Sequence, residues 1–270
     1  MNEKKFPEPI EALMIIIGVF AVLILLSSII VVWQNPSEVE TNIKETSKLF
    51  YVIGGLAFLI IPVIYVRIRG YDMVEIFRLR PVSSEIFMLS IVLALASVVV
   101  SDEADRLIQM LVPLPDWFEQ QMETLRAVTT GDWILVIFAA VVLAAVSEEM
   151  LFRGFLQISL EKKGDVTKAV ILSSLAWTLV HLNIYWAIQI FVLGVIMGFV
   201  SWRTNSVIPS MMVHGINNLI SLLVLNLELD TKMDWYLMGD HVSPFVLVPA
   251  ILVLVWSIRK ITAAAELRFE

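Results

Sequence analysis

The feature of this sequence that most constrains its fold is a series of apolar segments, each close to the length needed to cross a lipid bilayer. A spanning helix needs about 20 mostly apolar residues. Within a bilayer the backbone has no water to bond to, so such segments must be helical. We place spans near residues 11–33, 49–66, 84–100, 133–153, 168–184, 186–202, 206–227 and 243–259. The sequence therefore predicts an all-α, polytopic membrane bundle of about eight transmembrane helices.

The composition supports a membrane protein. Hydrophobic residues make up 59% of the 270 residues and charged residues 17%, and the mean hydropathy is +0.84. Soluble domains are about half apolar and a quarter charged. We expect residues 1–270 to form one integral membrane domain, without room for a large soluble one. The first apolar segment is too long for the core of a signal peptide and lacks a small-residue cleavage site, so we expect it to be retained.

The longest connection, residues 101–132, mixes acidic residues with large apolar ones. This mixture is typical of amphipathic helices that lie on a membrane surface. Pro113 and Pro115 interrupt a helix. We therefore expect one or two surface helices, broken at these prolines, between the third and fourth spans.

The basic residues predict the orientation of the bundle. With eight spans and a cytoplasmic N-terminus, 14 of the 19 Lys and Arg residues fall on the cytoplasmic side and 5 on the other. This is the bias of the positive-inside rule. We expect a multi-pass protein with both termini in the cytoplasm and with membrane lipids as partners.

Two counts exclude whole classes of function. The formal net charge of -7 argues against nucleic acid as a partner, because phosphate binding needs an excess of Lys and Arg. The absence of cysteine excludes disulfides, thiolate metal sites and a cysteine nucleophile. Neither count bears on the oligomeric state.

Three ionisable residues stand at the end of the fourth predicted span: Glu148, Glu149 and Arg153. Charged groups inside a bilayer are costly and indicate a functional site by default. Residues four apart share a face of a helix, whereas neighbours point about 100° apart. Glu149 should therefore pair with Arg153, and Glu148 is left to act as a general base or acid. The alternative is a purely structural ion-pair cluster.

Two of the three histidines also lie in predicted spans. His181 follows the apolar run 169–180, and His214 lies one helical turn before Asn218. A single buried histidine is more often a packing residue than a catalyst, but several such polar groups are costly to bury together. His241 lies in the loop before the last span, where we assign it no role.

These residues are suited to hydrolysis. A glutamate with two histidines and an asparagine can activate water and stabilise an oxyanion. Alternatively, Glu148, His181 and His214 could hold a zinc ion with an open position, as in a metalloendopeptidase. The sequence has no His-Glu-x-x-His, Gly-x-Ser-x-Gly or Gly-x-Gly-Asp motif, so serine and paired-aspartate mechanisms lack support.

The motifs and their order resemble those of the CPBP family of intramembrane endopeptidases (CAAX proteases and bacteriocin-processing enzymes, also called Abi), and in particular its prenyl-protein, Ras-converting type. The family motif Glu-Glu-x-x-x-Arg, with Phe before the Arg and Gly after it, is matched throughout by residues 148–154. The motif Phe-x-x-x-His is present at 177–181 with Trp in place of Phe, and His-x-x-x-Asn is present at 214–218. The resemblance covers residues 139–219, within a predicted catalytic core of about 133–227.

The resemblance implies a glutamate-dependent hydrolase that cuts peptide bonds near the cytoplasmic membrane face. Glu148 and His181 would activate the attacking water, and His214 and Asn218 would stabilise the oxyanion. The substrate would be the C-terminus of a prenylated Cys-a-a-X protein, or a bacterial leader or membrane peptide.

The remaining motif residues would support this chemistry. Glu149 and Arg153 would be the structural pair of the catalytic set, and Trp177 and Phe152 would line the substrate pocket. We expect no permanently bound metal, because Asn218 is a poor zinc ligand and a good hydrogen-bond donor. Zinc stays the alternative.

Two other classes of function stay open. A proton-coupled transporter would also bury Glu and His, but the inverted repeats and broken helices typical of transporters are not visible in the sequence. A non-catalytic scaffold would be free to lose at least one of the costly residues. The pair Gly194 and Gly198 is interpreted as a site of close helix packing.

Overall fold

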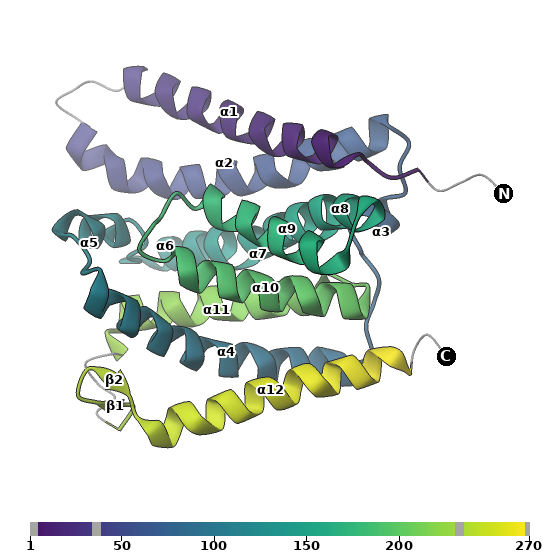
Figure 1. Cartoon of the computed structure of the whole chain (residues 1–270). Coiled ribbons are helices and arrows are strands. Elements are labelled where there is room, and N and C mark those ends of the chain that lie inside the picture. Colours follow the sequence, from purple (N-terminus) through teal and green to yellow (C-terminus); the bar gives the residue numbers. More distant parts are fainter. Residues whose placement is uncertain (1–4, 34–38, 230–234, 268–270) are drawn as a thin grey trace.

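The structure, a computed structural model, describes residues 5–33, 39–229 and 235–267. In these ranges the chain forms a bundle of helices with one two-stranded antiparallel hairpin (Figure 1). The all-α, polytopic bundle predicted from the sequence is confirmed. The elements are α1 (Pro9–Trp33), α2 (Val39–Ile68), α3 (Met73–Ile76), α4 (Ser84–Leu111), α5 (Asp116–Glu123), α6 (Thr130–Val136), η1 (Ile137–Leu143), α7 (Ala144–Glu149), η2 (Met150–Leu156), α8 (Gln157–Lys163), α9 (Val166–Val180), α10 (Ala187–Thr204), α11 (Ile208–Leu227), β1 (Leu237–Met238), β2 (His241–Val242) and α12 (Pro244–Glu266).

Seven helices of the described chain are long and apolar enough to cross a membrane. The fifth predicted span, 168–184, is the exception, because α9 has only 15 residues. At 1.5 Å per residue it is about 22 Å long, short of the roughly 30 Å hydrocarbon core. The helix ends where Leu182 adopts a left-handed backbone (φ 49°) and the Asn183 side chain accepts from the N–H groups of the following turn. Of the about eight predicted spans, seven therefore have helices of spanning length, and the fifth is a shorter apolar helix.

The start of α1 and the end of α12 lie at the same end of the bundle (Figure 1). The seven long helices together with α9, the shorter apolar helix, produce this arrangement. The orientation with this end in the cytoplasm stays a prediction from the charge bias.

α4 is longer than predicted and takes up part of the connection 101–132. It runs unbroken to Leu111, so its last turns continue the third span where we expected a separate surface helix. The chain breaks at the two prolines as predicted, and α5 begins at Asp116. α5 packs against the turn that follows α9, where the Phe118 ring lies 4.7 Å from that of Trp186.

One long helix, residues 130–163, carries the motif 148–154. It begins with a capping box, in which Thr129 and Asp132 each accept from the backbone N–H of the other. Two π-helical segments, η1 and η2, interrupt the α-helical winding on either side of α7. Such segments are rare and are frequent at functional sites. The winding therefore changes on both sides of the two glutamates.

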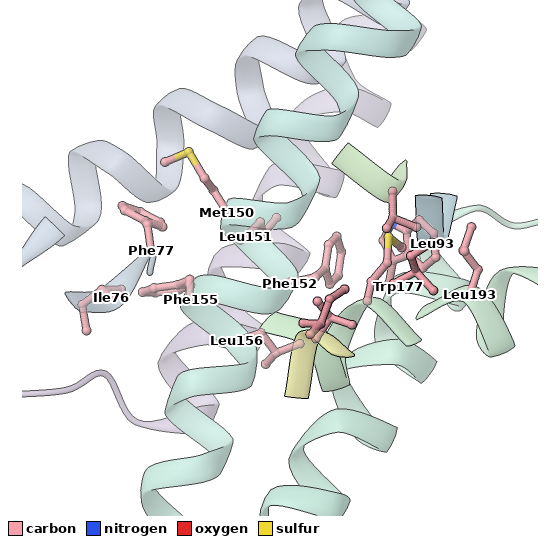
Figure 2. Packing of buried hydrophobic residues seen from close by; sticks show 14 of the residues in the cluster. Ile76, Phe77, Leu93, Met150, Leu151, Phe152, Phe155, Leu156, Trp177 and Leu193 are labelled. Carbon is pink, nitrogen blue, oxygen red and sulfur yellow. The ribbon is translucent and has the colours of Figure 1, made fainter. Parts of the chain in front are cut away.

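The hydrophobic core surrounds this helix. Figure 2 shows Phe155 on the side that faces Phe77, and Phe152 on the opposite side. Gly154 allows α3 to approach, because a Cβ at this position would lie 2.8 Å from the Cα of Phe77. Contacts that close to a backbone atom cannot be relieved by rotating a side chain. Gly154 therefore fixes how the motif helix sits against the link between α3 and α4.

Arg78, in that link, is a buried cation that the sequence did not single out. Its side chain is 3% exposed, pairs with Glu161, and donates from Nη1 to the carbonyl oxygen of Arg153 at 3.2 Å. The carbonyl oxygen of Arg78 accepts from the N–H of Val207 at 3.1 Å. Arg78 thus ties the connections before α4 and before α11 to the motif helix.

Gly194 and Gly198 bring α10 close to its neighbours, as predicted. A Cβ at Gly194 would lie 3.1 Å from the Cβ of Ser174, and one at Gly198 would lie 2.9 Å from the side-chain oxygen of Gln157. Gln157 also donates to the carbonyl oxygen of Gly198 at 3.0 Å. The glycine pair is therefore a packing motif, as such pairs commonly are.

Candidate active site

Glu149 lies at the centre of a buried charged cluster. Its Oε1 accepts from Nη1 of Arg153 at 2.8 Å and lies 3.0 Å from Nδ1 of His214. Glu149 and Arg153 are fully buried, and His214 is 3% exposed. The ion pair expected from the helix spacing is present, and His214 of α11 joins it. The cluster is costly to break, because removing one charge leaves the other buried without a partner.

Glu148 has a separate environment, as the helix geometry predicts. Its side chain is half-buried, and Oε2 accepts a hydrogen bond from the indole Nε1 of Trp177 at 2.6 Å. This donor is uncharged, so it holds the carboxylate without neutralising it. The two adjacent glutamates therefore differ, because Glu149 is buried and ion-paired while Glu148 is partly accessible and hydrogen-bonded.

His181 is the C-cap residue of α9, and its side chain is exposed. Its Nδ1 lies 2.8 Å from the backbone carbonyl oxygen of Trp177. A carbonyl oxygen can only accept, so this hydrogen bond requires the proton to be on Nδ1. In the neutral ring, Nε2 then carries a lone pair and can accept a proton. The backbone of Trp177 thus determines which nitrogen of His181 is basic.

Trp177 is the residue that these side chains share. It is 2% exposed, and its ring centroid lies 4.9 Å from that of His181 and 5.3 Å from that of His214. The guanidinium carbon of Arg153 lies 4.3 Å from the ring centroid, within cation–π range. Trp177, in α9, therefore contacts residues of three other elements, α7, η2 and α11, and the C-cap of its own helix.

Asn218 and Phe152 are placed differently from each other. Asn218, one turn after His214, donates from Nδ2 to the carbonyl oxygen of Ala140 in η1 at 2.8 Å. Phe152 is fully buried in the hydrophobic core, with its ring 6.4 Å from that of Phe58. The structure thus brings Asn218 to the helix that carries the glutamates, whereas it places Phe152 in the packed core.

The zinc alternative requires Glu148, His181 and His214 to face one ion. In the part of the chain that the structure describes, no three His, Asp or Glu side chains are grouped so that they could hold a metal. Nδ1 of His214 is directed at Glu149, and Oε2 of Glu148 is directed at the Trp177 indole. The residues present do not fit a zinc site in this arrangement.

Sequence reasoning missed two parts of the site. The first is the donor role of Trp177, although a buried indole N–H usually finds a hydrogen-bond partner, and this rule could have found it. The second is the Ala140 carbonyl that holds Asn218, because a backbone acceptor on another helix leaves no mark in the sequence.

These features define an integral membrane protein with several passes and a polar site inside its helical bundle. Residues 130–220, about a third of the chain, match the family described as type II CAAX prenyl endopeptidase, Rce1-like. This match assigns residues 130–220 to a family of CAAX-type endopeptidases, which are hydrolases, and it supports an endopeptidase activity for the chain. The matched range contains every residue of the predicted catalytic set. The chain matches no curated protein and no solved structure.

Proposed function

We propose that this protein cuts peptide bonds near the cytoplasmic face of the membrane, with Glu148 and His181 activating the attacking water. The observation that carries the proposal is that Trp177 holds both groups. Its N–H donates to Glu148, and its carbonyl oxygen accepts from His181. In each partner a proton acceptor remains, namely the second carboxylate oxygen of Glu148 and Nε2 of His181.

The proposed reaction is a general base hydrolysis. The water oxygen bonds to the scissile carbonyl carbon while one water proton passes to Glu148 and Nε2 of His181 accepts a hydrogen bond from the water. The π electrons of the carbonyl move to its oxygen and form a tetrahedral oxyanion. When the C=O bond re-forms, the C–N bond breaks and Glu148 returns the proton to the leaving nitrogen. General acid–base catalysis of this kind contributes about 10²–10⁴-fold.

We propose that His214 and Asn218 bind the oxyanion. Asn218 uses one amide N–H for the Ala140 carbonyl and has a second to donate. His214 directs Nδ1 at Glu149, so donation from Nε2 requires the imidazolium form, whose charge the carboxylate of Glu149 would stabilise. Glu149 and Arg153 then serve as the pair that holds His214. Removal of one oxyanion donor typically costs about 10²–10³-fold in kcat.

The substrate proposal follows from the description of the family. That description names CAAX prenyl endopeptidases, which supports the C-terminus of a prenylated Cys-a-a-X protein as the substrate. A bacterial leader or membrane peptide is the alternative. The charge bias supports both termini in the cytoplasm, where such a C-terminus would be exposed.

Paired peptides test this proposal. The purified protein is incubated with a prenylated Cys-a-a-X peptide, with the same peptide lacking the prenyl group, and with a hydrophobic leader peptide, and the products are identified by mass spectrometry. We expect one cut in the prenylated peptide and its loss in His181→Ala. If only the leader peptide is cut, the substrate class is leader peptides and not prenylated C-termini. If none of the three peptides is cut, the proposal is wrong.

We propose that the reaction needs no bound metal, since no three His, Asp or Glu side chains among the described residues are grouped so that they could hold one. Cleavage should therefore survive prolonged treatment with a strong chelator, with no stoichiometric metal detected by elemental analysis. A loss of cleavage that added zinc restores would contradict the metal-free mechanism.

A further inference from the structure

We propose that Trp177 is a positioning residue of the reaction, whose indole N–H holds Glu148 in place and keeps its role separate from that of Glu149. This inference rests on the proposed function of Glu148 as the general base. It assigns a chemical purpose to the tryptophan that stands where the family motif has phenylalanine.

The hydrogen bond has the properties of a fixed contact. Nε1 and Oε2 lie within hydrogen-bond distance, at 2.6 Å, and a bond to a carboxylate is stronger than one between neutral groups. The indole is 2% exposed, so water cannot readily replace it. A phenylalanine ring could fill much of the same space, but it has no N–H to donate.

The face and the edge of the Trp177 indole contact groups of opposite charge. The guanidinium carbon of Arg153 lies over the face of the ring, 4.3 Å from its centroid. Glu148 lies at the ring edge, where the N–H points. The face of an indole carries partial negative charge and its edge partial positive charge. Trp177 thus engages Arg153 and Glu148 at once, while Arg153 forms its ion pair with Glu149.

Gly194 makes room for the indole. A Cβ on Gly194 would lie 3.2 Å from Cε3 of Trp177 and 3.1 Å from Cβ of Ser174. Cε3 belongs to the benzene ring of the indole, which is fused to the five-membered ring that carries the N–H. The first glycine of the Gly-x-x-x-Gly pair therefore allows α10 to pass beside the larger ring without displacing its N–H from Glu148.

Indole N–H signals test the contact directly. The chain has 8 tryptophans, and the ¹H–¹⁵N signal of Trp177 is identified as the one missing from Trp177→Phe. In Glu148→Gln this signal should move upfield, because a neutral amide oxygen is a weaker acceptor than a carboxylate. The control is Glu85→Gln, which changes an exposed glutamate and should leave the signal unchanged. An unchanged signal in Glu148→Gln would overturn the inference.

Steady-state kinetics test whether the hydrogen bond from Trp177 to Glu148 contributes to catalysis. Trp177→Phe should lower kcat by about 10- to 100-fold with little change in KM, the range expected for loss of one hydrogen bond to a charged group. The matched control is Trp202→Phe, because Trp202 also lies beside an arginine. The guanidinium carbon of Arg203 is 5.3 Å from the centroid of the Trp202 ring. This control should keep full activity. Unchanged kcat in Trp177→Phe overturns the positioning role.

The outcomes separate this inference from the proposed function. If Glu148→Gln is inactive while Trp177→Phe is fully active, the general base stands and the positioning role is wrong. If Glu148→Gln is active, the proposed function itself is wrong. The signal shift is measured with Trp177 intact, and if Trp177→Phe does not fold, the signal is identified by elimination from single Trp→Phe variants of the other tryptophans. The same indole signal can be followed in Gly194→Ala, which should shift it by crowding the ring.

Discussion

Replacing Arg153 with methionine should destabilise the bundle by about 3–5 kcal/mol, the cost of leaving one partner of a buried ion pair uncompensated. Arg153 and Glu149 are both 0% exposed and lie 2.8 Å apart between Nη1 and Oε1. Methionine fills a similar volume, so the loss of the charge dominates the effect. The Glu149 carboxylate would lose its cationic partner and keep its contact with His214, at 3.0 Å.

Reversible unfolding in SDS, followed by far-UV circular dichroism, measures this change. The double variant Glu149→Gln with Arg153→Met should recover most of the loss, since no buried charge is then left alone. Arg106→Met is the matched control, because Arg106 and Asp102 form a pair with the same spacing at 3.2 Å but with 26% and 31% exposed side chains. It should cost at most about 1 kcal/mol. If Arg153→Met and Arg106→Met cost the same, the buried cluster has been misjudged.

Two further substitutions should affect stability through packing. Gly154→Ala should lower the unfolding free energy by about 1–3 kcal/mol, because the added carbon overpacks against the backbone of the link after α3. In the same SDS titration Gly18→Ala is the control. It should be neutral or slightly stabilising, because no atom lies within 4 Å of the added carbon. Phe118→Ala should lower the unfolding free energy by about 3 kcal/mol, since Phe118 is 3% exposed and packs on Trp186 in the turn after α9. Trp117→Ala, at a position 55% exposed, should cost clearly less, and equal losses would argue against this anchoring of α5.

The sequence was sufficient to predict the fold class, because hydropathy reports directly which segments avoid water. It was insufficient for the length of α9. The residues after His181 stay fairly apolar, and the helix ends because Leu182 and Asn183 form a turn. The continuation of α4 to Leu111 was missed for the opposite reason, since acidic residues within a long helix resemble a surface segment. Hydropathy therefore located the helices but not all of their ends.

Some contacts of the candidate site could likewise be predicted from the sequence, and others could not. The pairing of Glu149 with Arg153 follows from a spacing of four residues within one helix, and the structure contains it. The contact of Trp177 with Glu148 joins two helices. It depends on how closely those helices pack, which Gly194 helps to determine. Contacts within a helix could be predicted from spacing, whereas contacts between helices needed the three-dimensional arrangement.

The role of Glu148 as general base is tested most directly by the single-turnover rate of peptide cleavage by Glu148→Gln, compared with wild type and with Glu85→Gln. Glutamine keeps the shape of the side chain and can accept from the Trp177 indole, but it cannot take a proton from water. The rate of Glu148→Gln should fall by at least about 10²-fold while Glu85→Gln cleaves normally. A Glu148→Gln rate within about threefold of wild type would mean that Glu148 contributes no transition-state stabilisation and is not the general base.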